Sequence, residues 1–153
     1  MADDEAQAFT DFVERVEPRL RMSLMARYGV ERGREATAEA LVYAWENWRS
    51  VGSLEYPIAY LFRVGRSRTR LRKPPAIQRV GYHTDSNLVE PGLGPALVSL
   101  SGKQRMAVTL VHAFGWTHAE AAEVMEIKEP TVKTHVQRGL AKLRKALEVT
   151  TDA

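Results

Sequence analysis

The stretch SGKQRMAVTLVHAFGWTHAEAAEVMEIKEPTVKTHVQRGLAKLRKAL, residues 101–147, contains two signals for the start of a helix. Ser101 is followed three residues later by Gln104, and Thr117 is followed at the same distance by Glu120. In each pair the hydroxyl can accept a bond from the first turn of a helix, and the longer side chain can return one. The sequence therefore predicts helices that begin at these two positions.

The second of these helices is expected to be short and to end at a tight break. It runs from Thr117 through Met125, the break covers residues 126–128, and a longer helix follows over residues 129–148. Apolar residues recur along the longer helix at spacings of three and four, at Val132, Val136, Leu140, Leu143 and Leu147. This spacing places them on one inward face, so the segment predicts a helix-turn-helix.

The opposite face of the longer helix is polar and carries Thr131, Lys133, Thr134, His135, Gln137 and Arg138. Such a face suits the major groove of DNA, because its side chains can donate and accept hydrogen bonds at base edges. We expect DNA contacts from Lys128, Thr131, Lys133, Thr134, His135 and Arg138, with Lys142 as a further candidate. The alternatives are a helical hairpin that binds only protein and a helix face that is merely solvated.

The composition indicates a globular protein without disulfide bonds. The chain has 153 residues, 44% of them hydrophobic, which suits one compact domain or two small ones. The absence of cysteine excludes thiolate metal ligands and fits a reducing compartment. The acidic start MADDEAQAFTDF does not resemble a signal peptide, and no run approaches the roughly 20 apolar residues of a membrane span. We therefore expect a cytoplasmic protein with no membrane partner.

Charge is distributed unevenly, although the net charge is only +3. Residues 3–17 contain six acids and one arginine, whereas residues 63–73 contain six basic residues and no acid. The basic run predicts contact with a polyanion such as nucleic acid.

Two helices are expected before residue 50. The first covers residues 7–28, where Pro18 should cause a kink or start a new helix and Gly29 should end the pattern. The second runs from about residue 32 to residue 49. Its apolar stripe consists of Leu41, Ala44, Trp45 and Trp48. We assign Trp45 to the core and leave Trp48 as either core or surface.

After a loop at residues 50–56, Pro57 suits the first position of a third helix, which Pro74 would stop. This helix carries both aromatic and basic side chains, at Tyr60, Phe62, Arg63, Arg66, Arg68 and Arg70. Rings that stack on bases beside cations that contact phosphates suit a melted DNA strand. The alternative places Tyr60, Leu61 and Phe62 in the core beside solvated arginines, and for Leu61 we expect the core.

Residues 74–95 contain four prolines and three glycines without a sustained hydrophobic period, which predicts a flexible linker. No internal repeat and no clear strand pattern occurs along the sequence. We therefore predict an all-α chain of two small helical domains, residues 1–73 and residues 96–153, with a short turn near residues 96–100 and the helix-turn-helix in the second domain.

The sequence carries no pattern typical of an enzyme. The four histidines, His83, His112, His118 and His135, are scattered, and no pair has the spacing of a metal-binding helix. No glycine-rich phosphate loop, nucleophile elbow or pair of catalytic carboxylates occurs. We expect no catalytic residue, no cofactor and no metal site.

The motifs along the whole chain resemble a bacterial RNA polymerase sigma factor of the small, extracytoplasmic-function type, which has domains two and four only. Residues 100–147, including RGLAKLR, resemble the family's domain that binds the minus-thirty-five promoter element. The segment EATAEALVYAWENW, residues 35–48, resembles its polymerase-clamp-binding helix. The segment YPIAYLFRVGRSRTR, residues 56–70, resembles its helix for minus-ten recognition and strand opening.

The resemblance implies a promoter-specificity subunit whose partners are core RNA polymerase, promoter DNA and an anti-sigma factor. It implies that Glu35 and Glu39 face the clamp of the largest polymerase subunit and that the flap of the second-largest subunit is also bound. Residues 48–55 would capture an extruded minus-ten base. The residues implied in minus-ten binding and melting are Trp48, Arg49, Tyr60, Arg63, Arg66, Ser67 and Arg70.

The sequence departs from the family pattern in two helices. Arg34 stands where an acid is common in the clamp-binding helix, and Ala38 replaces a polar residue. The recognition helix starts with Lys128, Glu129 and Pro130 in place of a small hydroxyl cap, and Glu129 would repel a phosphate if it faced DNA.

The segment EPTVKTHV, residues 129–136, also resembles the recognition helix of LuxR-type response regulators. Two alternatives to a sigma factor therefore stand: a LuxR-type helix-turn-helix regulator and a sigma-like protein used as an interaction module.

Overall fold

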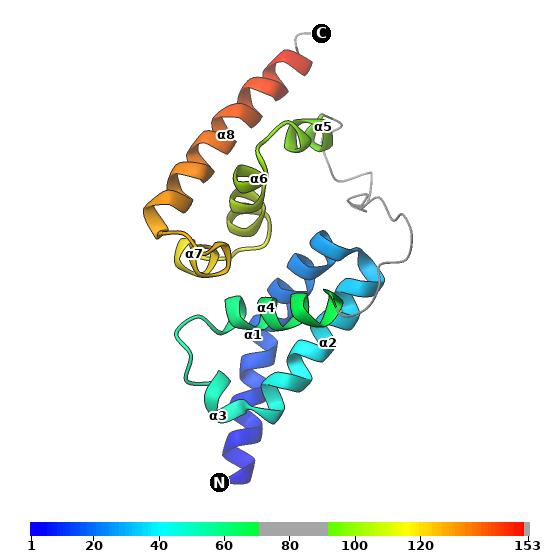
Figure 1. The fold of residues 1–153 in the computed structure, drawn as a ribbon, viewed down its shortest axis with the longest axis vertical. Helices are drawn as coiled ribbons and strands as arrows, with labels where there is room; N and C mark the ends of the chain where they lie inside the picture. Colours follow the sequence, from blue (N-terminus) through cyan, green and yellow to red (C-terminus); the bar gives the residue numbers. More distant parts are fainter. Residues whose placement is uncertain (71–91, 152–153) are drawn as a thin grey trace. The chain divides into compact units, whose positions relative to one another are not determined.

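The computed structural model describes residues 1–70 and 92–151, and within these ranges it consists of helices joined by short turns (Figure 1). The chain divides into two compact units, Met1–Gly81 and Tyr82–Ala153, which are described separately. The prediction of an all-α fold with two helical parts is confirmed. Most of the predicted linker, residues 74–95, lies outside the described residues.

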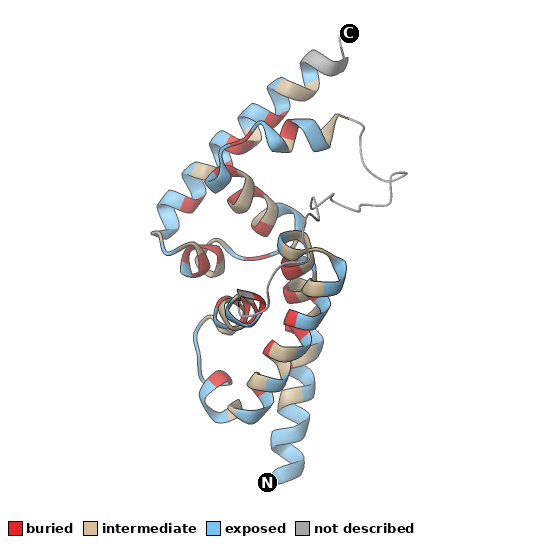
Figure 2. Cartoon of the chain, turned by 45° about the vertical axis from the view of Figure 1, so that its right-hand side comes forward, coloured by how far each residue is buried: buried red, intermediate tan, exposed pale blue. Residues whose placement is uncertain are grey.

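The described part of the first unit, residues 1–70, contains four helices: α1 (Ala2–Tyr28), α2 (Val30–Glu46), α3 (Trp48–Val51) and α4 (Pro57–Arg70). Helices α1, α2 and α4 pack against one another. Their inward faces carry the buried residues, as Figure 2 shows. The core of this unit consists of Phe12, Val16, Leu20, Leu24, Ala36, Ala40, Ala44, Val51, Ile58, Ala59, Leu61 and Phe62.

Helix α1 continues through Pro18, and no second helix begins there. Proline removes one backbone donor from a helix interior and crowds the carbonyl four residues earlier. Pro18 lies on the exposed side of α1, where water can satisfy that carbonyl, so the packed face of the helix is unaffected. Gly29 ends α1 as predicted, with a φ of 90° that favours glycine.

The buried face of α2 consists of small residues. It differs from the apolar stripe that the sequence predicted for this helix. A Cβ atom on Gly33 would lie 2.4 Å from the Cα atom of Met25, so the backbones of α1 and α2 approach closely there. The remaining buried residues of α2 are Ala36, Thr37, Ala40 and Ala44. Because the helices approach along this small-residue face, Trp45 remains 51% exposed, with its ring centroid 4.9 Å from that of Phe9 on α1. The assignment of Trp45 to the core was wrong.

Helix α2 also ends earlier than predicted, at Glu46, and Trp48 belongs to the short helix α3. Helix α4 begins at Pro57 as predicted, and Leu61 is fully buried as expected. Phe62 is buried as well, with 2% of its surface exposed. The expectation that Phe62 offers a stacking surface was therefore wrong, because its ring belongs to the core.

The second unit contains α5 (Leu93–Val98), α6 (Gly102–Val108), a π-helical turn η1 (Thr109–Ala113), α7 (His118–Met125) and α8 (Glu129–Thr151). Both predicted capping boxes are present. The Ser101 hydroxyl accepts from the Gln104 backbone N–H at 3.2 Å, and the Thr117 hydroxyl accepts from that of Glu120 at 3.0 Å. In each box the longer side chain accepts the returning bond. The helix starts predicted from these residues are confirmed.

The sequence predicted a linker up to residue 95 and then a short turn. The structure has a helix there instead, α5, which begins at Leu93. Gly92 and two prolines nearby obscured a helix whose stability comes from packing on α8. Ala96 is buried in a cluster with Leu100, Val108 and Leu143. Half-buried residues complete this cluster, namely Leu93, Leu97, Leu140, Ala146 and Leu147.

The predicted inward stripe of α8 is confirmed. Val132, Val136 and Leu143 are buried, and the other two members of the stripe are half-buried. Gly139 lies on the same side, where a Cβ atom would be 2.6 Å from the Cγ2 atom of Val108. This glycine therefore lets α8 and α6 pack closely.

We expect Gly139→Ala to lower the free energy of unfolding of the second unit by about 1–3 kcal/mol, as overpacking typically does. Val108 is buried, and a valine in a helix strongly prefers one rotamer, so it cannot turn aside easily. Gly102→Ala is the matched control, because nothing lies within 4 Å of its Cβ position. Urea denaturation measures both. Equal stability of the two variants would mean that α6 and α8 separate at little cost.

Candidate nucleic-acid interface

A tight turn between α7 and α8 fixes the direction of the long helix. Glu126 ends α7 in the left-handed region, with a φ of 58°. The Ile127 backbone N–H donates to the Ala122 carbonyl at 3.2 Å. The Lys128 carbonyl then accepts from the first turn of α8, from Thr131 N–H at 3.0 Å and Val132 N–H at 3.2 Å. The backbone therefore caps both sides of the turn without a hydroxyl side chain.

The predicted contact face of α8 is exposed along its first three turns. Lys128, Thr131, Lys133, Thr134 and Arg138 are all exposed, whereas His135 is half-buried. The Nδ1 atom of His135 is buried and makes no hydrogen bond. The structure thus brings these six residues together at one end of α8, with His135 at the border between the exposed face and the core.

Two of these residues have local partners within α8. The Thr134 hydroxyl donates to the Pro130 carbonyl at 3.1 Å. The Lys133 ammonium lies 3.8 Å from the Glu129 carboxylate, one turn earlier. Glu129 is exposed and close to a cation, so Lys133 partly neutralises the acid that the sequence placed at the start of this helix.

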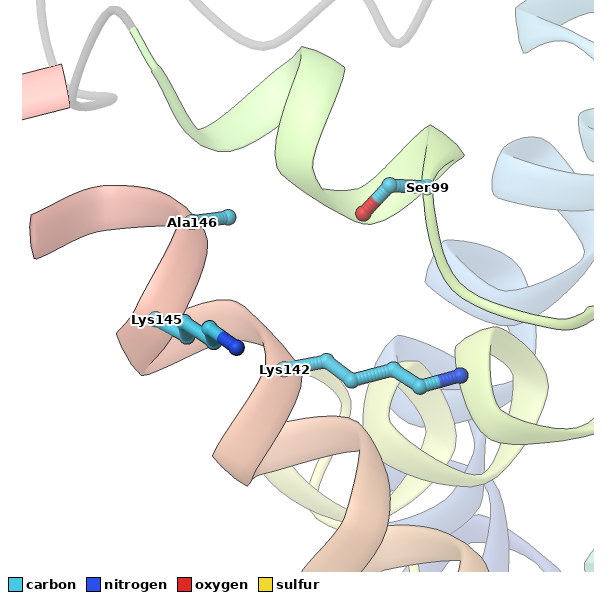
Figure 3. Close-up of a pocket in the computed structure, with 4 residues that line it drawn as sticks. All are labelled: Ser99, Lys142, Lys145 and Ala146. Carbon is cyan, nitrogen blue, oxygen red and sulfur yellow. The ribbon is translucent and has the colours of Figure 1, made fainter. Parts of the chain in front are cut away.

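Lys142 differs from the other cations of α8. Its ammonium donates to the Gln104 side-chain oxygen at 3.1 Å and so connects α8 to α6. Figure 3 shows its side chain extending toward α6, beside a shallow hollow that is also lined by Ser99, Lys145 and Ala146. Gln104 thus serves both the capping box and this bond, a double use that the sequence analysis missed.

In the first unit, three predicted minus-ten residues share the outer face of α4. Tyr60, Arg63 and Ser67 follow one another at helical spacings of three and four. Tyr60 is 37% exposed, Ser67 is exposed and Arg63 is half-buried. Arg66 lies nearer the buried side of the helix and is half-buried. The side chain of Arg70 lies outside the described part of the structure.

Tyr60 is paired with Tyr43 of α2, which the sequence analysis did not single out. The two hydroxyl oxygens lie 2.9 Å apart, and the ring centroids lie 6.0 Å apart with the ring planes at 40°. The hydrogen bond to Tyr43, with a smaller effect of burial, raises the pKa of Tyr60. The pairing depends on how α2 and α4 pack, so sequence spacing gave no signal for it.

Trp48 and Arg49, also predicted for minus-ten binding, lie on α3 and face the start of α1. The half-buried Trp48 ring is 5.3 Å from the Phe9 ring and 5.1 Å from the Phe12 ring. The Arg49 guanidinium lies 3.6 Å from the Glu5 carboxylate and is 91% exposed. The segment predicted as a base-capturing loop, residues 48–55, therefore begins as a helix.

The two predicted polymerase-binding residues lie one turn apart on α2. Glu35 is exposed and Glu39 is half-buried. Val42 and Trp45 follow at helical spacing and are 57% and 51% exposed. The surface of α2 that was predicted to bind polymerase through Glu35 and Glu39 therefore also carries exposed apolar side chains.

In the described ranges, no group of three or more histidine, aspartate or glutamate side chains is arranged to hold a metal ion. Of the helices in those ranges, none combines the length and apolar character needed to span a membrane.

Comparison with known proteins gives a family match for the part of the chain that contains the helix-turn-helix. Residues 95–143 match the family model described as Sigma-70, region 4, which covers the helix-turn-helix. Comparison of the sequence with curated proteins gave no match.

Two solved structures share the fold of the chain. One is the sigma factor RpoE in complex with the anti-sigma factor NepR from Bartonella quintana, with 24% identity, 92% of this chain and 97% of that chain covered, and a TM-score of 0.63. The other is CnrH in complex with the cytosolic domain of CnrY, with 22% identity, 95% of each chain covered, and a TM-score of 0.64. The resemblance found in the sequence is confirmed for the C-terminal unit by the family model and for the whole chain at the level of the fold.

The turn between α7 and α8 allows a direct test. A non-glycine residue in the left-handed region costs roughly 1 kcal/mol, so Glu126→Gly should raise the free energy of unfolding by about 0.5–1 kcal/mol. Glu123→Gly, on the exposed side of α7, is the control and should lower it by about 1 kcal/mol. Thermal unfolding of the two variants checks the difference, and destabilisation by Glu126→Gly would contradict the described turn.

Proposed function

We propose that this chain, which carries a sigma-70 region 4 match at its C-terminal end and has the fold of small sigma factors, is a promoter-specificity subunit of RNA polymerase. The observation that carries the proposal is that the exposed polar face of α8 lies within the region 4 match, residues 95–143. The fold similarity over nearly the whole chain extends it to the first unit.

The first turns of α8 enter the major groove at the minus-thirty-five element. The groove is about 12 Å wide and admits a helix, and Arg or Lys commonly bonds guanine there. Arg138 and Lys133 are two of the exposed cations of this face and supply base or phosphate contacts. Thr131, Thr134, His135 and Lys128 complete the contact surface.

The outer face of α4 holds the opened minus-ten strand. Tyr60 offers a ring for base stacking, and Arg63 and Ser67 lie along the same face. Arg66, Arg70, Trp48 and Arg49 supply further contacts from the flanks of the first unit. Opening costs a few kcal/mol for each unstacked base, so stacking and phosphate contacts are needed together.

The remaining partners are proteins. Glu35 and Glu39 on α2 bind the clamp of the largest polymerase subunit, with the exposed Val42 and Trp45 extending that surface. The second unit binds the flap of the second-largest subunit. RpoE was solved with an anti-sigma factor, and we propose a regulator of that class for this chain too.

Run-off transcription on a genomic promoter library tests the proposal. Core polymerase with this protein should initiate at sites that core polymerase alone does not use. A lack of initiation dependent on the protein would refute the proposal. Tight duplex binding without polymerase would then favour a LuxR-type regulator, and recovery of a regulatory protein without polymerase subunits would favour an interaction module.

Arg138→Ala should weaken promoter binding by about 5- to 150-fold, since a good base contact contributes roughly 1–3 kcal/mol. Association with core polymerase should not change. Arg144→Ala is the matched control, because Arg144 is an exposed arginine six residues further along α8, on a different side of the helix. Electrophoretic mobility shifts and pull-downs measure the two activities. Parallel loss of both in Arg138→Ala would contradict separate roles for the two units.

Glu35→Lys should have the opposite effect. Reversing an exposed charge at the clamp surface should weaken core association at least about tenfold, because juxtaposed like charges at an interface cost several kcal/mol. Duplex binding through α8 should be retained. Glu14→Lys, an exposed acid of α1, controls for the change in net charge. Unaltered core affinity in Glu35→Lys would place the clamp contact elsewhere.

A further inference from the structure

We infer that Tyr43 and Tyr60 act together as a two-ring stacking surface, here called the tyrosine pair, for the bases of single-stranded DNA. The inference deepens the proposed function and rests on it, since it adds Tyr43 to the minus-ten face of the first unit. Tyr43 comes from α2, the helix otherwise assigned to polymerase, and so the pair joins the two surfaces.

The geometry of the pair is set by the core beneath it. Helices α2 and α4 pack against each other, and their buried residues include Ala40 and Ala44 of α2 and Ile58 of α4. Above that core the two hydroxyl oxygens are 2.9 Å apart. The ring centroids are 6.0 Å apart, with the planes tilted by 40°. Because both helices are held by the core, the two rings form a fixed surface before any ligand binds.

The pair remains open to solvent, which an internal brace would not require. Tyr60 is 37% exposed and Tyr43 is half-buried, and their hydrogen bond is itself exposed. An exposed aromatic surface of this kind suits a nucleobase, because every base has a flat face that can stack irrespective of sequence.

The hydroxyl groups add a polar function to the stacking surface. One hydroxyl donates to the other, so the accepting oxygen keeps its own O–H for an outside acceptor. The bond to Tyr43 raises the pKa of Tyr60. The pair can therefore stack on a base and donate one hydrogen bond to the strand.

The next turn of α4 after Tyr60 carries a half-buried cation. Arg63 follows Tyr60 by one turn of α4, and Ser67 follows Arg63 by one further turn. A strand that stacks on the tyrosine pair would run its phosphates along these side chains. Stacking rings beside cationic side chains are the combination that single-strand binding proteins use.

The test uses the full chain, alone and with core polymerase, and a fluorescent single-stranded DNA of mixed sequence. Tyr43→Ala should weaken binding of this probe by about 5- to 150-fold, the equivalent of roughly 1–3 kcal/mol for one stacked base. Tyr43→Phe keeps the ring and should lose much less. Tyr28→Ala is the matched control, since Tyr28 is a half-buried tyrosine at the end of α1 whose ring faces Arg27.

Photocrosslinking separates stacking from a structural role. A probe containing 5-iodouracil should crosslink to Tyr43 or Tyr60 in the wild type and not to Tyr28, as peptide mapping would detect. If the pair were only a brace, the Tyr43 variants would unfold more easily but would bind the probe as the wild type does, with no crosslink at either ring. That result would overturn the inference. So would a wild-type protein that does not bind the probe either alone or together with core polymerase.

Transcription reports separately on the proposed function. Initiation by the wild type together with unchanged probe binding by Tyr43→Ala would refute the tyrosine pair alone. Probe binding that depends on Tyr43 in a protein that does not support initiation would refute the proposed function and leave the pair standing.

Discussion

The close contact between α6 and α8 at Gly139 is the constraint on which the second unit depends. A methyl group at this position would lie 2.6 Å from Val108, so only glycine lets the two helices meet at this distance. Leu143 is buried in a cluster with Val108, and Val132 and Val136 are buried on the same side of α8, so packing on that side decides which side of the helix faces outward. The polar face proposed for DNA is thus a consequence of packing on its opposite side.

The elements that the sequence predicted are those whose signals are local. The two capping boxes, the helix start at Pro57 and the inward stripe of α8 each depend on residues within a few turns of one another. Helix α5 and the exposed position of Trp45 depend on which elements pack together, and no local pattern contains that information. The pairing of Tyr43 was not predicted for the same reason, because its partner, Tyr60, lies seventeen residues away on another helix.

In the first unit, α2 packs against its neighbours through small residues, and this packing determines which side chains lie on the surface. With Gly33, Ala36, Ala40 and Ala44 against its neighbours, α2 lies close to α1, and its larger side chains are left at the sides and on the outside. Val42, Trp45 and Tyr43 are therefore available for contacts outside the core. One helix can then support both an apolar, acidic face and a tyrosine beside α4.

The bond between Lys142 and Gln104 bears on how binding would respond to ionic strength. Each phosphate neutralised by a protein cation releases counterions, which contributes about 0.9 to the slope of log affinity against log salt concentration on duplex DNA. The Lys142 ammonium is held toward α6 by Gln104, so it would have to give up this bond before it could turn to a phosphate. The salt dependence of this domain would therefore be shallower, by about one phosphate contact, than a count of the basic residues on α8 suggests.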